Sequence, residues 1–247
     1  MKLYLVRHAQ SENNVLWLGA DNTDGRSSDP EITATGHQQA EQLAQHLAHP
    51  QGEPRQHPYN PVETTHFGLT HVYCSLMTRS ILTARYIANA CNLELQALPE
   101  IFEKYGIYEF DETGNRLGLP GPGLSYFANR FPGVNLPMGL TEDGWWDRPA
   151  ETNGDFQSRV RSVIEDIRIR HARTDDCIAM VVHGDFMDQF INELMQVPRH
   201  EHNYANDWAA NWTFHNTSLS RIDFIRGSHN IIYLNRIDHL PAELISC

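Results

Sequence analysis

The stretch Lys2-Leu3-Tyr4-Leu5-Val6-Arg7-His8 begins in a continuous apolar run and ends with a cation and an imidazole. Apolar character that is continuous rather than alternating predicts a strand covered on both faces, as in the middle of a parallel sheet. Arg7 and His8 then fall at the carboxyl end of the strand, the edge at which open α/β sheets bind ligands. Taken alone, the dipeptide fits a chance surface pair better, so its meaning depends on the rest of the chain.

Apolar periodicity predicts strands that alternate with helices, the pattern of an α/β fold. The glycine at 227 marks a turn between the last two strands, and polar loops are expected at 13–31 and 49–68. Strands are predicted at 3–6, 71–75, 93–96, 177–182, 218–225 and 230–235, and helices from Thr33 or Thr35 to Leu47 and at 78–88, 156–167 and 186–195.

The pattern is lost between Glu100 and Gly154, where glycine and proline cluster at 117–123 and 131–133. Loops of this length inside a domain usually act as lids or contain short helices of their own. We interpret 104–154 as an insertion or lid within a single domain that spans 1–247. Its aromatic residues could line a substrate cleft or could fix the insertion to the core, and the sequence favours neither: Trp145, Trp146, Tyr105, Tyr108 and Phe110.

Composition excludes several classes of function. The formal net charge of −12 argues against a general nucleic-acid binder, but a local basic pocket can still hold a small anion. The longest apolar runs, such as Cys177 to Val182, are far shorter than the ~20 residues that cross a bilayer, and no signal peptide is evident, so a cytoplasmic protein is expected. The four cysteines, Cys74, Cys91, Cys177 and Cys247, lack metal-type spacing and are expected to be free thiols.

Chemistry-bearing residues follow three of the predicted strands. Arg7 and His8 follow the first strand, Arg79 the second, and His183 the strand at 177–182. If these strands are parallel neighbours, two arginines and two histidines meet at one edge of the sheet. Guanidinium groups match phosphate oxygens, and a neutral imidazole is a competent nucleophile, so the set suits a phosphoryl group.

At this point the chain resembles the histidine phosphatase superfamily, in its phosphoglycerate-mutase-like branch. The resemblance covers about 1–103 and 155–195 and rests on four motifs in the order of the family. The first motif, similar to R-H-G-E-S-x-x-N, is Arg7-His8-Ala9-Gln10-Ser11-Glu12-Asn13-Asn14, and the second, similar to L-T-x-x-G, is Ile32-Thr33-Ala34-Thr35-Gly36. The third, similar to S-x-x-x-R-x-x-x-T-A, is Ser75-Leu76-Met77-Thr78-Arg79-Ser80-Ile81-Leu82-Thr83-Ala84. The fourth resembles the second histidine turn of the family and is Val181-Val182-His183-Gly184.

The resemblance implies a three-layer α/β/α sandwich with a mostly parallel central sheet, and it implies residue roles. His8 would be the phosphorylated nucleophile, Arg7, Arg79 and His183 would hold the phosphoryl oxygens, and Asn14 would add a hydrogen bond to the same group. No cofactor and no metal are implied.

A carboxylic acid should protonate the leaving oxygen and later activate water, which requires a raised pKa. The acid of the family precedes an aromatic-glycine step, and Glu103-Lys104-Tyr105-Gly106 fits this pattern best. Glu100, Glu109 and Asp185 remain rivals for this role.

Three departures from the family pattern bear on function. Ala9 replaces the usual glycine, which requires a negative φ and slightly more room. The Arg-Arg-Ser-Tyr segment with which the mutases hold phosphoglycerate has no counterpart, and Asp185 replaces an asparagine. A carboxylate at that position repels a second anionic group unless it is paired. These departures favour a phosphatase over a mutase.

The expected activity is therefore hydrolysis of a small phosphorylated metabolite through a phosphohistidine. A mutase-type phosphoryl transferase and a weakly catalytic phospho-ligand-binding module are the alternatives. We expect no nucleic acid or membrane partner, and the sequence leaves open whether the chain forms a homodimer. His200-Glu201-His202 follows Pro198 and is interpreted as a solvated loop rather than a metal site.

Overall fold

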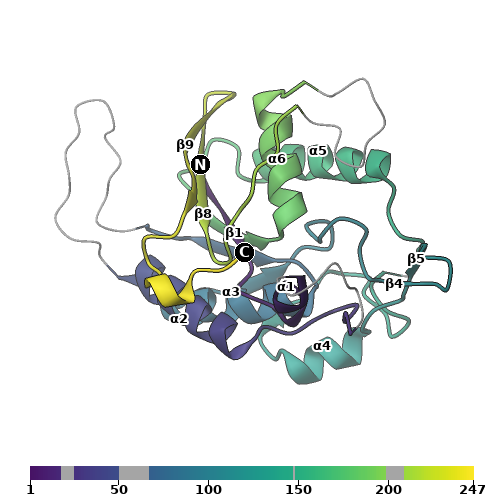
Figure 1. Cartoon of the computed structure of the whole chain (residues 1–247). Coiled ribbons are helices and arrows are strands. Elements are labelled where there is room, and N and C mark those ends of the chain that lie inside the picture. The colour runs from purple at the N-terminus through teal and green to yellow at the C-terminus, as the bar shows by residue number, and fades with distance from the viewer. Residues whose placement is uncertain (18–24, 50–66, 147, 199–208) are drawn as a thin grey trace.

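The protein is built around a seven-stranded sheet in the order β6-β3-β2-β7-β1-β8-β9 (Figure 1). The computed structural model describes residues 1–17, 25–49, 67–146, 148–198 and 209–247. Five neighbouring strands are parallel, and the last two extend the sheet as antiparallel strands. In sheet order the strands are Val134–Asn135 (β6), Leu95–Ala97 (β3), His71–Cys74 (β2), Cys177–Val182 (β7), Lys2–Arg7 (β1), Leu219–Ile225 (β8) and Ser228–Arg236 (β9).

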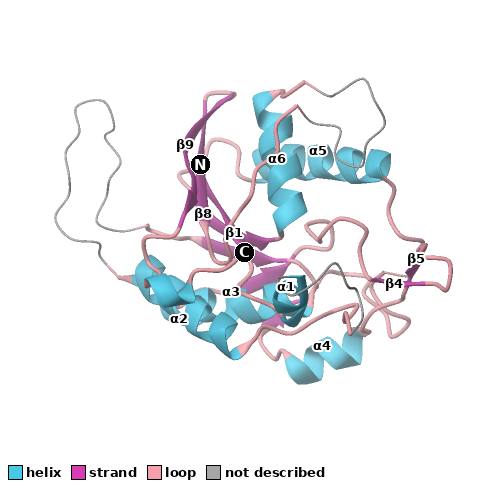
Figure 2. Cartoon of the chain, viewed as in Figure 1, coloured by secondary structure: helices cyan, strands magenta, loops and turns pink. Residues whose placement is uncertain are grey.

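Helices cover both faces of this sheet, which confirms the predicted three-layer fold (Figure 2). Side chains alternate along β7: Ile178 and Met180 pack with α5 and α6, whereas Ala179 and Val181 pack with α2 and α3. Because both faces are buried, the strand needs apolar residues at every position. The helices are Asn153–Arg170 (α5) and Gly184–Met195 (α6) on one face, with Ala34–Ala48 (α2), Thr78–Cys91 (α3) and Leu124–Arg130 (α4) on the other.

Local structure corrects two predictions and refines a third. The short helix α1, Glu12–Trp17, occupies part of the stretch expected to be a loop. The region after Glu100, in which the sequence shows no regular pattern, contains three short strands and α4. Of the two candidate caps for α2, Thr33 is the one used, since its hydroxyl accepts a hydrogen bond from Gly36 N. Most of the predicted loop at 49–68 lies outside the described residues.

The segment 104–154 is tied to the sheet and to the core. Its hairpin consists of Tyr108–Phe110 (β4) and Arg116–Gly118 (β5), whereas its strand β6 pairs with β3 in the central sheet. Trp146 is buried and packs edge-on against Phe102, with ring centroids 4.7 Å apart. The ring also covers Gly106, where φ is +73° and no side chain would fit. Of the two roles considered for the aromatic residues, Trp146 fixes the insertion to the core.

The described helices include none that combines enough length and apolar character to cross a membrane. The cysteines Cys74, Cys91, Cys177 and Cys247 are free thiols, as predicted. Cys74 and Cys177 are buried in their strands, where each behaves as a small apolar side chain.

Gly36 allows α2 to approach the loop that follows β1. A Cβ at this position would collide with the backbone oxygen of Gln10, which already accepts a hydrogen bond from Thr33 N at 2.9 Å. We therefore expect Gly36→Ala to reduce the free energy of unfolding by about 1–3 kcal/mol, the usual cost of overpacking, as measured by chemical denaturation.

Gly154 supplies the matched control, because it also lies in the first turn of a helix. A Cβ there would meet only Thr152 Oγ1, at 3.9 Å. Gly154→Ala should leave the stability unchanged or raise it by up to about 1 kcal/mol through helix propensity. Equal losses in the two variants would contradict the proposed contact with Gln10.

Candidate active site

The site lies where three parallel strands end side by side. Strand β7 runs between β1 and β2, so the residues that follow these strands converge at one edge of the sheet. The rings of His8 and His183 have centroids 5.2 Å apart, and Arg79 Nε donates to His8 Nε2 at 3.1 Å. The arrangement brings together Arg7, His8, Arg79, Glu103 and His183, the five residues predicted to carry the chemistry.

The imidazole of His8 is held in one orientation and one tautomer. Its Nδ1 lies 2.7 Å from the backbone oxygen of Ala9, which can only accept, so Nδ1 carries the proton. The lone pair of Nε2 then faces Arg79. Burial lowers the pKa of His8 well below its ordinary value, and the charges of Arg79 and Arg7 lower it further. His8 is therefore neutral at neutral pH, with its nucleophilic nitrogen directed into the site.

Ala9 occupies the position where the family pattern has glycine. It is fully buried, and it is absent from the residues with positive φ, so an alanine fits this backbone without strain. Ala9 N donates to Thr83 Oγ1 at 3.0 Å, and that hydroxyl donates to Arg79 O at 2.8 Å. The threonine of the Arg79 motif thus joins the loop after β1 to helix α3.

His183 presents a hydrogen-bond donor to the same site. Its Nε2 lies 2.8 Å from Ser75 Oγ, and that hydroxyl also accepts from Met77 N at 3.3 Å. The serine hydroxyl can donate its proton to Nε2, and the ring proton of His183 is then on Nδ1. Nδ1 is buried and has no hydrogen-bond partner among the described residues. Burial and the charge of Arg79 lower the pKa of His183 well below its ordinary value.

Two arginines lie beside these neutral rings, Arg79 buried and Arg7 partly buried. Arg7 Nη1 donates to the backbone oxygen of Phe214, whereas its Nε is buried without a hydrogen-bond partner in the described part of the chain. Arg79 is 8% exposed, and its Nη1 lies 4.0 Å from Asp29 Oδ1. Burial lowers the pKa of both guanidinium groups. The negative charge of Glu103 opposes this for Arg7, and the charges of Asp29 and Glu103 oppose it for Arg79. Two such cations create a site for an anion.

Glu103 lies at the start of α6, beside the arginines. Its Oε1 accepts from Phe186 N at 3.1 Å and from Lys104 N at 2.9 Å, and Oε2 lies 3.4 Å from Asp185 N. Burial raises the pKa of Glu103 to about 7, helped by the charge of Asp185 and opposed by Arg79 and Arg7. A carboxyl with this pKa can give and take a proton near neutral pH.

The three rivals of Glu103 lie in different surroundings. Glu100 and Glu109 have exposed side chains, so solvent screens their charges. Asp185 is also exposed, in the first turn of α6, and its charge raises the pKa of Glu103 and of Arg7. Asp185 thus influences the site electrostatically, whereas Glu103 is partly buried within it and accepts a hydrogen bond from Phe186 N.

Asn14 faces the site from α1. Its Oδ1 accepts from Ser11 N at 2.9 Å, from Ser11 Oγ at 3.0 Å and from Asn216 Nδ2 at 3.2 Å. Asn216 Nδ2 also donates to His8 O at 3.1 Å. Because its oxygen is fully used, Asn14 can offer only its amide N–H groups to a ligand.

Three residues of this site were not given roles by the sequence. Ser75 belongs to a recognised motif at the end of the second predicted strand. Because His183 also follows a predicted strand, this position could have indicated that the two side chains are partners. Asp29 and Asn216 lie in loops without periodicity, and only the fold brings them to Arg79 and His8.

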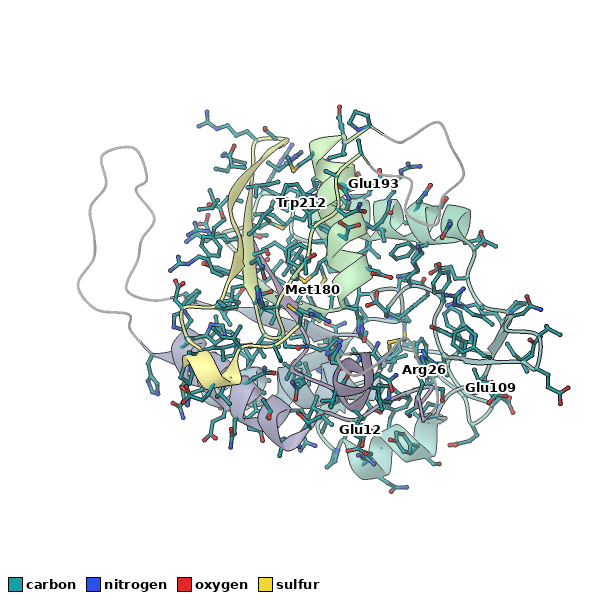
Figure 3. The ribbon with its side chains drawn as sticks, in the orientation of Figure 1. Glu12, Arg26, Glu109, Met180, Glu193 and Trp212 are labelled. Carbon is teal, nitrogen blue, oxygen red and sulfur yellow. The ribbon has the colours of Figure 1, made fainter. Side chains whose placement is uncertain are left out.

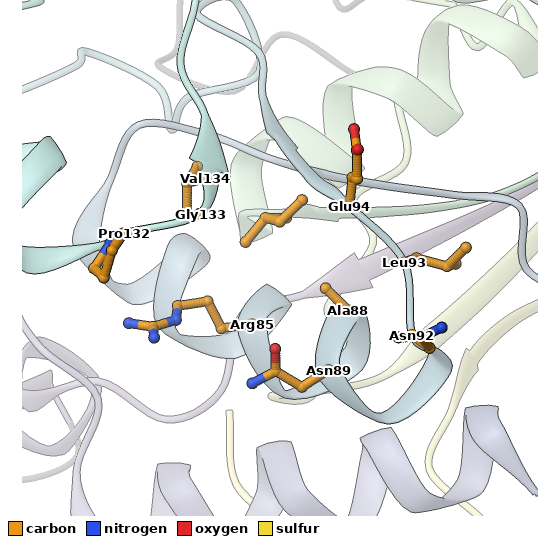
Figure 4. A pocket seen from close by; sticks show the side chains of 10 residues that line it. Arg85, Ala88, Asn89, Asn92, Leu93, Glu94, Pro132, Gly133 and Val134 are labelled. Atoms are coloured by element: carbon orange, nitrogen blue, oxygen red, sulfur yellow. The ribbon is translucent and has the colours of Figure 1, made fainter.

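Two other features of the described residues lie at the opposite edge of the sheet. A hollow of about 330 Å³ beside the amino ends of β3 and β6 is lined by Arg85, Asn89 and Glu94 among others (Figure 4). His71, His171 and Asp176 have ligand atoms within 4.8 Å of one another, but both ring nitrogens of His171 already contact Tyr73 and Asp176. The segment His200-Glu201-His202 lies outside the described residues.

Curated relatives match over most of the chain. It is 24% identical over 225 residues to a probable phosphoglycerate mutase GpmB of Photorhabdus laumondii, covering 91% of this chain and 85% of that protein. A probable phosphoglycerate mutase GpmB of Yersinia pestis is 26% identical over 235 residues, with the same coverage.

Solved structures of low identity share the fold. Phosphoserine phosphatase from Entamoeba histolytica, in complex with 3-phosphoglyceric acid, is similar to this chain with a TM-score of 0.57 and 19% sequence identity. The match covers 97% of this chain and 99% of the phosphatase chain. Mycobacterial glucosyl-3-phosphoglycerate phosphatase has a TM-score of 0.58 and 16% identity, with coverage of 95% and 98%. The model of the histidine phosphatase superfamily (branch 1) matches residues 3–56 and 63–237, and the chain belongs to this family.

Proposed function

We propose that the protein hydrolyses small phosphomonoesters through a phosphohistidine formed on His8. The observation that carries this proposal is the geometry of His8: a neutral ring, locked by Ala9 O, with its Nε2 lone pair facing Arg79. Nucleophile, cations and a carboxyl of suitable pKa then lie together at one edge of the sheet. The named activities of the structural neighbours, phosphoserine and glucosyl-3-phosphoglycerate phosphatase, support a hydrolase.

In the first step His8 Nε2 attacks phosphorus while the bond from phosphorus to the leaving oxygen breaks. The substrate displaces the hydrogen bond from Arg79 to Nε2, so that Arg79, Arg7 and His183 Nδ1–H donate to the phosphoryl oxygens. Protonated Glu103 gives its proton to the leaving oxygen, and the alcohol departs. The positive charge of the phosphorylated ring is stabilised by the hydrogen bond from Nδ1–H to Ala9 O.

In the second step water attacks the phosphohistidine. Glu103, now a carboxylate, takes a proton from the water, the bond from nitrogen to phosphorus breaks, and inorganic phosphate leaves. Both half-reactions use one carboxyl in its two states, which is efficient when its pKa is close to the working pH.

A mutase is the second candidate, because the curated relatives carry that name. The two activities share the phosphohistidine and differ in what attacks it, water or a second hydroxyl of the bound product. Incubation with 2-phosphoglycerate separates them: isomerisation without release of inorganic phosphate indicates the mutase.

The first prediction concerns the covalent intermediate. Base quench of the enzyme after rapid mixing with phosphorus-labelled p-nitrophenyl phosphate should trap an acid-labile label on His8. His8→Ala should abolish the label and the turnover, whereas His229→Ala, a change at the β8–β9 turn, should alter neither. A wild-type protein that binds phosphate without becoming labelled would instead be a phospho-ligand-binding module.

The second prediction concerns the pH dependence. Because protonation of the leaving oxygen needs Glu103–H, kcat/KM for an alkyl phosphate should be flat at low pH and fall tenfold per pH unit above about 7. Glu103→Gln should lose turnover of the alkyl phosphate but still form phosphoenzyme from p-nitrophenyl phosphate, whose leaving group needs no proton. The label should then accumulate because the base for hydrolysis is missing. Unchanged turnover in Glu103→Gln would assign the proton transfer to another group.

The third prediction concerns Asp29, a positioning residue for Arg79. Asp29 accepts from Thr78 N at 3.0 Å and from Thr78 Oγ1 at 2.7 Å, and it lies 4.0 Å from Arg79 Nη1. Asp29→Asn keeps an acceptor for Thr78 N but removes the charge, so kcat/KM should fall about tenfold, the effect of one charge-assisted contact, while Tm changes little. The pH profile set by Glu103 should shift to lower pH, because Arg79 then carries its charge without a counter-ion. If Tm and kcat/KM of Asp29→Asn decreased together, the role of Asp29 would be purely structural.

A further inference from the structure

A second pair of cations lies beside the phosphoryl site. Arg26 sits over the ring of Tyr108, with its guanidinium carbon 4.0 Å from the ring centroid, and its Nη1 donates to Tyr108 O at 2.8 Å. Arg116 lies 3.8 Å above the ring of Tyr105 and 5.3 Å from the centroid of Tyr108. Arg26 comes from the loop before α2, and Arg116 from β5 of the hairpin.

The pair is within electrostatic reach of the phosphoryl site. The positive charge of Arg26 contributes to lowering the pKa of Arg79. Tyr105, on which Arg116 stacks, is two residues beyond Glu103 in the chain. Figure 3 shows Arg26 on the side of the molecule that carries the hairpin, near Glu109.

The described residues provide no carboxylate for either cation. Neither Arg26 nor Arg116 forms an ion pair among them, although the chain has 31 acidic residues against 19 basic ones. For Arg26, stacking on a tyrosine offsets only ~0.5–1 kcal/mol of the cost of keeping the cation out of bulk water, whereas Arg116 is exposed. Arg26 is half-buried, and burial together with the charge of Arg116 lowers its pKa. Two like charges held together in this way favour the binding of an anion.

Charged residues of opposite sign lie on different elements around the phosphoryl site. Asp185 lies on α6 and repels an anionic group that extends toward that helix. Arg26 and Arg116 lie on the loop before α2 and on the hairpin, and they attract an anion there. A substrate tail with a negative charge is therefore directed toward the hairpin.

We propose that Arg26 and Arg116, held by the rings of Tyr108 and Tyr105, bind a second anionic group of the phosphomonoester substrate. The inference rests on the proposed function and narrows its substrate class to esters whose tail carries a carboxylate or a second phosphate. Guanidinium forks recognise both groups through paired N–H donors.

Matched substrates test this proposal. For the carboxylate, 3-phosphoglycerate is compared with glycerol 3-phosphate, in which a hydroxymethyl group replaces the carboxylate. For the phosphate, the bisphosphate of 1,3-propanediol is compared with its monophosphate. The wild-type protein should prefer the anionic tail by about tenfold or more in kcat/KM in one of these pairs, and that pair identifies the group.

Charge-removing variants locate the preference. In Arg26→Gln and in Arg116→Gln the preference should fall several-fold, and in the double variant it should approach one. Arg168→Gln is the matched control, since Arg168 also lies over an aromatic ring, that of Phe224, and donates to a backbone oxygen, that of Gly227. This arginine lies at the end of α5 and should leave the preference unchanged. Arg116 is exposed, so its variant tests the proposal even if Arg26→Gln folds poorly.

Turnover of p-nitrophenyl phosphate separates the two levels of the hypothesis. If the wild-type protein does not hydrolyse this ester or any other substrate of the series, the proposed function is wrong. If it hydrolyses the ester but shows no preference in either matched pair, or keeps the preference in the Arg26 and Arg116 variants, the anionic subsite is wrong and the phosphatase stands.

Discussion

The site depends on holding two arginines, Arg79 buried and Arg7 partly buried, next to two imidazoles that must stay neutral. Burial, followed by the charges of Arg79 and Arg7, lowers the pKa of His8, so the ring keeps the lone pair that a nucleophile needs. The same ring is oriented by Ala9 O, whose hydrogen bond fixes the proton on Nδ1. The charges of the two arginines, the tautomer of His8 and the orientation of its ring are therefore linked. A change in one of them affects the other two.

A carboxyl with an intermediate pKa completes this arrangement. Burial and the negative charge of Asp185 raise the pKa of Glu103, whereas Arg79 and Arg7 lower it. The balance leaves Glu103 able to exist in both protonation states near neutral pH. Asp185, which the sequence presented as an obstacle to a second anion and as a rival proton donor, thus raises the pKa of Glu103.

The segment 104–154 supports the site in two ways. Trp146 packs against Phe102 and covers Gly106, so it fixes the backbone on both sides of Glu103. The hairpin brings Arg116 toward Arg26 through the shared ring of Tyr108. This segment therefore carries the attachment to the core together with Arg116, one of the two arginines that we propose to bind a second anionic group of the substrate.

The sequence by itself predicted an α/β fold, because a strand buried on both faces must be apolar throughout and helices show their packing faces at regular spacing. The three-layer arrangement was implied by the resemblance of the motifs to the family. It also placed Arg7, His8, Arg79 and His183 at strand ends, because the apolar runs that form the strands stop at these residues. The parallel order of β1, β7 and β2, which brings the four residues together, comes from the tertiary structure. The resemblance favoured Glu103 as the acid, but only the tertiary structure separated its surroundings from those of Glu100, Glu109 and Asp185, and only it brought Asp29 and Asn216 to the site. Burial and contacts between distant loops arise from packing in three dimensions, and no periodicity of the chain encodes them.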